Sequence, residues 1–458
     1  MKSSNPGRGY FSYFSSNKAL IKSFKYYLTK KNIMKLVFHG AAKEVGRSCI
    51  ELQTQGDRYL LDAGIKFKEA GFAYPEKIIN LPDIDGLLIS HAHLDHTGAL
   101  PLFEHYNIIC PIYCTKLTYV LTKVLLKDSH KIARIRNLHP AYNNTDLHKL
   151  EKDVRFVKYD REYKHRKINF TFRNAGHVPG SAMILIEAEG KKILYTGDTK
   201  LRTTETVKGA FTDYHDIDVM IIESTYGARE LPDRAELKKK FLDKIEEVIN
   251  RGGSVLIPVF SLGRAQDILI MLAERKFKAP IYLDGMCKKI TNRILTISDP
   301  YVNNLGVLDE MFNRRVIHVS SEGHREQAMS RQGIFVTSSG MLQGGPVLSY
   351  LKEMWHEPKN AVLLTGYQCK RTNGRHLMEE GYIYLEGWRT YVKGEIEKFD
   401  FSGHADKNDL KEIIRRVHPK KLIIQHGDPD AVAEIGKWAS QETHSKVYMP
   451  ELGEEIEV

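Results

Sequence analysis

Three histidines and an aspartate lie within six positions of the segment SHAHLDHTGALP, residues 90–101: His91, His93, Asp95 and His96. A packed core does not account for them, because each of these groups is costly to bury without a partner. They follow the largely apolar run DGLLIS, residues 85–90, so the sequence places them on a loop after a strand. Alternate residues of such a loop can turn toward one point, and imidazole and carboxylate are ligands suited to Zn²⁺. The segment therefore predicts a metal site.

Further ligand-type residues stand at the ends of other predicted strands: His177 in AGHVPGS, Asp198 in YTGDT, Asp62 in LLDAG and His426 in IIQHGD. Each of them alone is more simply a turn residue or a satisfied polar residue. As a set they give more donors than one ion can use, so we expect two ions. Asp198 is then suited to bridge the ions, and Asp62 to orient one of the ligands.

The pattern of predicted helices and strands changes near residue 230 and again near residue 385. Up to about residue 230, short strands such as KLVFHG, SCIELQ and RYLLDAG are separated by glycine-containing turns, which is typical of hairpins. After that point helices and strands alternate, beginning with the helical period of AELKKKFLDKIEEVI, residues 235–249. This alternation predicts a parallel α/β unit inserted into a strand-rich domain. The expected boundaries are 34–230 for the first part of that domain, 231–385 for the insertion and 386–458 for the C-terminal part.

The first 33 residues carry seven of the charges behind the net charge of +11, and they contain no acidic residue. We expect a basic, flexible extension in residues 1–33. A nucleic-acid-binding arm and a misassigned start are the alternatives, since Met34 opens the first clear strand. A transit peptide is disfavoured, because only one of the seven cations is an arginine.

Length and composition exclude several classes of protein. A chain of 458 residues is too long for one simple core, and no apolar run approaches the roughly 20 residues that span a bilayer. The five cysteines form no CxxC pair, and a disulfide scaffold is not expected at this length. We therefore expect a protein of the reducing cytoplasm that has no membrane partner.

The ligand set resembles the metallo-β-lactamase superfamily, whose HxHxDH signature is followed by single His, Asp and His ligands in this order. The resemblance implies an α/β protein with an αββα sandwich and two Zn²⁺ ions per chain. It assigns one ion to His91, His93 and His177, and the other to Asp95, His96 and His426. Asp198 would bridge the two ions, and Asp95 would count among the catalytic residues as well.

Three further segments narrow the resemblance to the β-CASP branch, whose members process nucleic acids: IIESTYG (221–227), KFDFSGHAD (398–406) and LIIQHGD (422–428). Their motif residues are Glu223, His404 and His426, and an inserted Rossmann-like β-CASP domain is implied. EVGRSCIEL, near the start, is more similar to the nuclease subunit of the cleavage and polyadenylation specificity factor than to RNase J. The chain is similar to the short archaeal and eukaryotic form that has no KH domain.

The resemblance implies a zinc-dependent ribonuclease that acts on single-stranded RNA in 3′-end processing, maturation or decay. His404 would be the general acid, with Glu223 favouring its imidazolium form. Arg264 and Arg375 are candidate phosphate ligands, although an interdomain ion pair would account for each arginine equally well. Ser338 and Ser339, which precede a predicted helix, are candidates for a phosphate cradle, with a plain glycine-rich turn as the alternative.

Other functions stay open at this point. A DNA nuclease of the same superfamily is the nearest alternative, but a histidine at the third motif position, here His426, is the family's RNA-directed form. A small-substrate hydrolase would lack the insertion. An inactive RNA-binding scaffold would lose metal ligands, and none is missing. Endonuclease and 5′→3′ exonuclease action both remain open, as does a homodimer.

Overall fold

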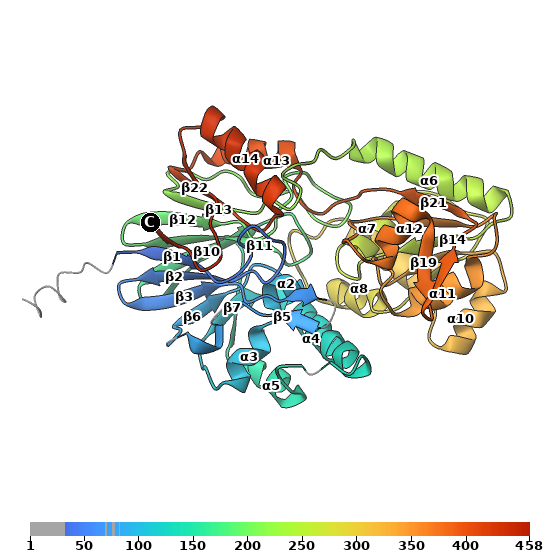
Figure 1. The fold of residues 1–458 in the computed structure, drawn as a ribbon, viewed down its shortest axis with the longest axis horizontal. Coiled ribbons are helices and arrows are strands. Elements are labelled where there is room, and N and C mark those ends of the chain that lie inside the picture. Colours follow the sequence, from blue (N-terminus) through green and yellow to red (C-terminus); the bar gives the residue numbers. More distant parts are fainter. Residues whose placement is uncertain (1–32, 69–70, 76–77, 82, 139) are drawn as a thin grey trace, which may run out of the picture.

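The computed structural model of the protein describes residues 33–458 except residues 69, 70, 76, 77, 82 and 139. The extension expected in residues 1–33 therefore lies, apart from its last residue, outside the described residues. The described chain forms three large β-sheets and two separate hairpins (Figure 1). Two of the large sheets pack face to face, and the third belongs to a second body beside them (Figure 1).

The first sheet has seven strands in the order β24 (Glu455–Glu457), β1 (Lys35–Phe38), β2 (Ile50–Thr54), β3 (Asp57–Leu61), β6 (Gly86–Leu88), β7 (Ile112–Thr115) and β8 (Val154–Val157). The second has seven strands in the order β23 (Lys446–Tyr448), β22 (Lys421–Ile424), β13 (Val219–Ile222), β12 (Lys191–Tyr195), β11 (Ala182–Ala188), β10 (Ile168–Asn174) and β9 (Glu162–His165). Strands β1, β2 and β3 are antiparallel neighbours, which confirms the hairpins predicted from their sequences.

The core of this first body lies between its two sheets. Phe38 and Leu61 from one sheet and Phe172 and Ile186 from the other are fully buried in it. Helices α3 (Leu100–His105), α4 (Lys116–Ile135) and α5 (Asn144–Lys149) cover the outer face of the first sheet. Helices α13 (Lys407–Val417) and α14 (Pro429–Glu442) cover that of the second. The predicted αββα sandwich is thus confirmed.

The third sheet has the order β16 (Val316–His318), β15 (Ile281–Asp284), β17 (Ile334–Thr337), β14 (Val255–Pro258), β18 (Ala361–Leu364) and β21 (Glu395–Lys398). All its pairings are parallel. One face packs against α6 (Arg234–Asn250), α7 (Arg264–Ala273), α8 (Cys287–Thr296) and α9 (Leu305–Glu310). The other packs against α10 (Glu322–Met329), α11 (Pro346–Met354) and α12 (Asn373–Glu380). A parallel sheet with helices on both faces is the Rossmann-like insertion that the sequence predicted.

The end of the insertion differs from the expected boundary at residue 385. Strand β21, residues 395–398, pairs with β18 and completes the third sheet, whereas the prediction assigned residues 386–458 to the first body. Residues 382–398 form short strands like those of the first body, so the local pattern does not mark this boundary. Two hairpins, β4 (Lys66–Lys68) with β5 (Gly71–Ala73) and β19 (Tyr382–Leu385) with β20 (Trp388–Tyr391), stand outside the large sheets.

Local sequence determines where several helices begin. The Asp233 carboxylate accepts hydrogen bonds from the backbone N–H groups of Ala235 and Glu236, so α6 starts at residue 234, one residue before the predicted helix. The Thr115 hydroxyl accepts the N–H of Thr118 at the start of α4. Within the described part of the chain, no helix is both long and apolar enough to cross a bilayer.

Candidate metal centre

The ligand-type residues converge because each follows a strand of the sandwich. His91 and His93 follow β6, His177 follows β10, Asp198 follows β12, Glu223 follows β13 and His426 follows β22. Asp95 and His96 belong to the short helix α2 (Leu94–Thr97), on the side of the sandwich that faces the third sheet (Figure 1). Loops at one edge of a sheet bring distant residues together on a rigid support.

Three imidazoles and one carboxylate form the first half of the cluster: His91, His93, His177 and Asp198. The His93 Nδ1 atom lies 3.2 Å from His91 Nε2 and 3.1 Å from His177 Nε2. Asp198 Oδ2 lies 3.6 Å from His91 Nε2. Ligand atoms around a tetrahedral zinc ion stand about 3.3 Å apart, given Zn–N bonds of about 2.0–2.1 Å. These spacings therefore suit a divalent ion.

The second half contains Asp95, His96, Asp198 and His426. Asp198 Oδ1 lies 3.3 Å from His96 Nε2 and 3.1 Å from His426 Nδ1. His426 Nε2 lies 3.6 Å from Asp95 Oδ2. Asp198 thus faces both halves, one carboxylate oxygen toward each. All seven donors that the sequence singled out as ligands meet in this double cluster.

Three buried atoms of the cluster have no hydrogen-bond partner within the described chain: His96 Nε2 and both carboxylate oxygens of Asp198. Buried polar atoms are normally hydrogen-bonded, so unsatisfied atoms where the two halves meet suit a bound cation. Burial lowers the pKa of His91 and of His177 well below the ordinary histidine value, which holds both imidazoles in the neutral, metal-binding form. The donor set therefore fits divalent metal.

Asp62 fixes one ligand of the cluster. Its carboxylate accepts the backbone N–H and the hydroxyl of Ser90, both at 2.7 Å, and the hydroxyl of Tyr195 at 2.6 Å. It also accepts the Nδ1–H of His96 at 2.6 Å, which directs His96 Nε2 toward Asp198. Asp62 is thus placed to orient a ligand, the arrangement that the sequence analysis expected of it.

Glu223 and His404 stand at the edge of the cluster. His404 Nδ1 lies 3.0 Å from Glu223 Oε2 and 3.8 Å from Asp198 Oδ2. Burial by itself lowers the pKa of His404, but the Glu223 and Asp198 carboxylates raise it above the ordinary value. Because its Nδ1 faces Glu223, His404 can present a proton on Nε2, and its side chain keeps 22% of its surface exposed.

The two candidate arginines already have carboxylate partners. Arg264 is buried, and its guanidinium donates to Asp267 Oδ2 at 2.9 Å within α7. Arg375 pairs with Glu379 one turn further along α12 and remains partly exposed. An ion pair, the alternative considered from the sequence, is what the structure contains at both positions, although each pair lies within one helix.

The hydroxyls of the two candidate serines are engaged by backbone groups of the insertion. The Ser338 hydroxyl accepts the backbone N–H of Met286 at 3.1 Å, beyond the end of β15. The Ser339 hydroxyl donates to the carbonyl of Gly344 at 3.1 Å and closes the turn before α11. Ser338 therefore ties this loop to the loop after β15, Ser339 closes the loop itself, and neither belongs to the cluster around Asp198.

Several contributors to the site were not singled out from the sequence. The ring of Tyr226 stacks on His404 with a centroid distance of 6.0 Å and an interplanar angle of 20°, and its hydroxyl donates to Asp400. Ser90 and Tyr195 complete the partners of Asp62. Position offered a signal for two of them, because Ser90 directly precedes His91 and Tyr226 lies within the Glu223 motif.

Three family descriptions match the chain. The metallo-beta-lactamase superfamily matches residues 42–242, the Beta-Casp domain residues 265–377, and the Zn-dependent metallo-hydrolase RNA specificity domain residues 391–450. Together they span both bodies of the fold and every strand that carries a residue of the cluster.

Similar proteins are known from archaea and from a eukaryote. The chain is 42% identical to "Probable RNase MJ4" of Methanocaldococcus jannaschii, over 93% of this chain and 100% of the relative. It is 35% identical to "RNase aCSPSF2" of Saccharolobus solfataricus, over 91% and 84%. It is 31% identical to "Cleavage and polyadenylation specificity factor subunit 3" of Dictyostelium discoideum, over 88% and 54%.

Among solved structures, a protein of unknown function from Enterococcus faecalis superposes with a TM-score of 0.58. The similarity covers 93% of this chain and 100% of that one at 15% identity. At this identity the similarity concerns the fold alone.

Proposed function

The chain belongs to the metallo-β-lactamase superfamily and to its β-CASP ribonuclease branch, and from this premise we propose a two-zinc hydrolysis of phosphodiester bonds in single-stranded RNA. The observation that carries the proposal is the double cluster around Asp198, whose two oxygens are buried without a hydrogen-bond partner in the described chain. His91, His93 and His177 would hold one ion, and Asp95, His96 and His426 the other. Asp198 would contribute one oxygen to each.

Bound zinc ions supply a nucleophilic water at neutral pH and a Lewis acid for the phosphoryl oxygen. The residues of the chain perform the remaining work. His404 donates a proton to the departing 3′-oxygen of the upstream nucleotide. Glu223 accepts the Nδ1–H of His404 and so keeps the proton to be transferred on Nε2. Tyr226 restricts rotation of the imidazole by stacking on it.

We place the enzyme among endonucleases that also have 5′→3′ exonuclease activity and act in RNA 3′-end processing, maturation or decay. The names of the archaeal and eukaryotic relatives support a ribonuclease that acts in RNA processing. A cytoplasmic location is consistent with five cysteines that are all free thiols. Circular RNA tests the endonuclease directly, since it offers no end. Failure to cut it, with degradation of a linear 5′-monophosphate RNA, would leave exonuclease action alone.

The two-metal assignment is tested with Asp198→Ala. We expect less bound zinc than the two ions per chain of the parent, and RNA cleavage reduced by at least about 10²-fold, the scale of a lost catalytic charge. Zinc is counted by mass spectrometry of the metal-loaded protein. His418→Ala, which removes an exposed histidine at the end of α13, is the control. Full cleavage by metal-depleted Asp198→Ala protein would refute the assignment.

The role of His404 is tested on a substrate whose 3′-bridging oxygen is replaced by sulfur. A thiolate departs without protonation, so an acid is no longer needed. His404→Ala should keep its metals and lose about 10²–10⁴-fold in cleavage of ordinary RNA, the contribution of one proton donor. It should recover most of this loss on the sulfur substrate, whereas Asp198→Ala should not. Equal losses on both substrates would assign His404 to ligand positioning instead.

A further inference from the structure

The hairpin β19–β20 exposes an aromatic face on the inserted domain. Its register pairs Tyr382 with Tyr391 and Tyr384 with Arg389. Directly opposite residues and residues two apart share a face, so these four side chains lie on one side of the hairpin. Tyr384 is 44% exposed and Tyr391 56% exposed. Two tyrosines of this exposure on neighbouring strands form an apolar surface of the kind that marks interaction sites.

The opposite face of the hairpin anchors it. Ile383 is fully buried, and Leu385 packs against the same core beneath α11 and α12. The turn consists of Glu386 and Gly387, both in the left-handed conformation that a two-residue hairpin requires. In the fold, β19 lies beside α12 (Figure 1). The aromatic face is therefore presented on a fixed support.

A cation and a second layer of rings accompany the tyrosines. The guanidinium carbon of Arg389, an exposed residue, lies 4.1 Å from the centre of the Tyr382 ring. On α12, His376 stacks on Tyr382 with a centroid distance of 5.1 Å and an interplanar angle of 20°. Aromatic rings interleaved with arginine are the composition that binds the bases and phosphates of single-stranded nucleic acids.

The local charge also suits a polyanion. Residues 370–393 contain five lysines and arginines against three glutamates. Each glutamate has a basic or histidine partner: Glu379 pairs with Arg375, Glu380 with His376 and Glu386 with Lys352. The glutamates are thus engaged by neighbouring side chains, while Arg389 contacts the ring and hydroxyl of Tyr382 and the side chains of Tyr384 and Tyr391.

A continuous segment joins this face to the metal centre. Near the centre, the ring centroids of Tyr367 and Tyr226 lie 6.3 Å apart, and Tyr226 in turn stacks on His404. The guanidinium of Arg229 lies over both tyrosine rings. Six residues further along the chain, Asn373 receives the backbone N–H of Tyr384 at 2.8 Å and donates to its carbonyl at 3.0 Å. The segment 367–373 therefore leads from the site of cleavage to the hairpin.

We propose that Tyr384, Tyr391 and Arg389 form a stacking platform for bases of single-stranded RNA at a distance from the scissile bond. This inference rests on the ribonuclease function proposed above and adds a second point of contact for the same substrate. The platform holds the RNA by its ring faces, which every base has, so it contributes affinity for longer substrates without strong sequence preference.

The test compares the double variant Tyr384→Ala/Tyr391→Ala with the parent holoenzyme. Unstructured RNAs of increasing length serve as substrates, and bis(p-nitrophenyl) phosphate reports on the metal centre alone. The KM for long RNA should rise about tenfold or more, since a lost base stack of about 1–3 kcal/mol corresponds to roughly 5- to 150-fold in affinity. The KM for the shortest RNAs and hydrolysis of the small diester should not change.

Tyr106→Ala and Phe156→Ala are matched controls, because they remove exposed rings of the first body at 45% and 52% exposure. Tyr391→Leu keeps apolar bulk without a π-face, and Tyr391→Trp keeps the π-face. Tyr391→Leu should raise the KM for long RNA by the contribution of one base stack, and Tyr391→Trp should behave like the parent. Circular dichroism verifies that each variant is folded.

Unchanged KM values at all lengths would overturn the platform while leaving the ribonuclease intact. A change of molar mass in light scattering, without a change in KM, would assign the face to self-association and would also overturn it. A parent protein that hydrolyses the small diester but neither binds nor cleaves RNA would instead refute the proposed function. The two failures are therefore distinguishable.

Discussion

At the scale of single residues, Asp62 is the position where one side chain controls the most. One carboxylate accepts four hydrogen bonds, two from Ser90 and one each from Tyr195 and His96. An asparagine would place an amide group, itself a donor, among donors, so the His96 ring would lose its fixed orientation.

We therefore expect Asp62→Asn to lower the zinc affinity of the cluster by about 10- to 100-fold, the usual effect of removing the partner of a ligating histidine. Competition with a chelator of known affinity measures this without reference to activity. Asp57→Asn is the matched control, because Asp57 begins the strand that Asp62 follows. Equal zinc affinity in Asp62→Asn and the parent would show that the Asp62 contacts do not orient a ligand.

The sequence identified the metal-ligand candidates because their chemistry is local. A run of histidine and aspartate directly after an apolar strand serves neither core packing nor a simple turn, and residues such as His91 and Asp198 lie together in the cluster. Tyr195 could not be found in this way, since its hydroxyl reaches Asp62 only through the tertiary fold. The ion pair of Arg264 could have been predicted from the sequence, because its partner Asp267 lies three residues further along the same helix.

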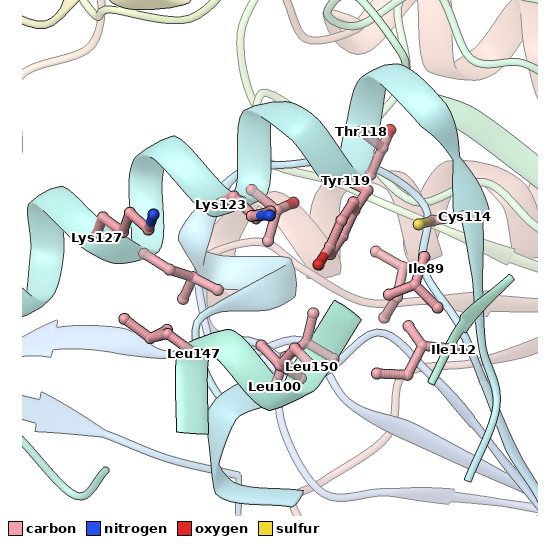
Figure 2. Close-up of a pocket in the computed structure, with 13 residues that line it drawn as sticks. Ile89, Leu100, Ile112, Cys114, Thr118, Tyr119, Lys123, Lys127, Leu147 and Leu150 are labelled. Atoms are coloured by element: carbon pink, nitrogen blue, oxygen red, sulfur yellow. The ribbon is translucent and has the colours of Figure 1, made fainter. Parts of the chain in front are cut away.

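At the scale of elements, α4 covers a small cavity above the first sheet (Figure 2). The cavity has a volume of about 10 Å³ and is lined mainly by aliphatic side chains of α4 and its neighbours, including Leu100, Leu147 and Leu150. Two hydroxyls on α4 that line it, of Tyr119 and Thr122, are buried and have no hydrogen-bond partner within the described chain. Unpaired buried hydroxyls destabilise a fold.

Thr122→Val should accordingly raise the free energy of unfolding by about 1 kcal/mol, because it removes an unpaired hydroxyl and keeps the branched shape. Thr118→Val is the matched opposite. Its hydroxyl lines the same cavity but donates to the carbonyl of Gly180 at 2.7 Å, so its loss should cost about 1 kcal/mol. Urea unfolding measures the free energy of unfolding of both variants. A Thr122→Val variant less stable than the parent would contradict the view that the Thr122 hydroxyl is unpaired.

A second prediction at this scale concerns pH and the contact of α3 with the segment after α5. Burial, a hydrogen bond with Asp153 and the charge of Asp153 raise the pKa of Glu104 from 4.5 to about 7. The folded protein therefore holds a proton that the unfolded chain releases, and stability falls as the pH rises between about 4.5 and 7. The Tm of Glu104→Gln should therefore rise relative to the Tm of the parent as the pH is raised from 5 to 8. An equal difference in Tm between variant and parent at pH 5 and at pH 8 would exclude this linkage.

At the scale of the whole molecule, the two bodies were predictable in kind but not in extent. The change from strand-rich segments to the helical period of α6 marked where the insertion begins, because periodicity is a local property. Its end was missed, because β21 joins the third sheet by parallel pairing with β18, about 30 residues earlier in the chain. A pairing of that range leaves no trace in the composition of residues 386–398.

A buried carboxylate is one of the links between the two bodies. In α7, Asp267 Oδ1 accepts the hydroxyl of Thr206 from the first body at 2.6 Å. Its Oδ2 accepts the guanidinium groups of Arg234 and Arg264, at 3.0 and 2.9 Å. Asp267 thus links a loop of the sandwich to two helices of the insertion.

Asp267→Asn should therefore lower the free energy of unfolding by about 3 kcal/mol, the lower end of the range for breaking a buried ion pair, because Arg234 keeps Glu205 as a second partner. The amide can still accept from Thr206, but its NH₂ group would face two guanidinium groups. Thr206→Val removes the hydroxyl that donates to Asp267, and because both residues share this hydrogen bond, the two losses should not add. Urea unfolding of the single and double variants measures this coupling. Strictly additive losses would mean that Asp267 stabilises the insertion alone and does not join the two bodies.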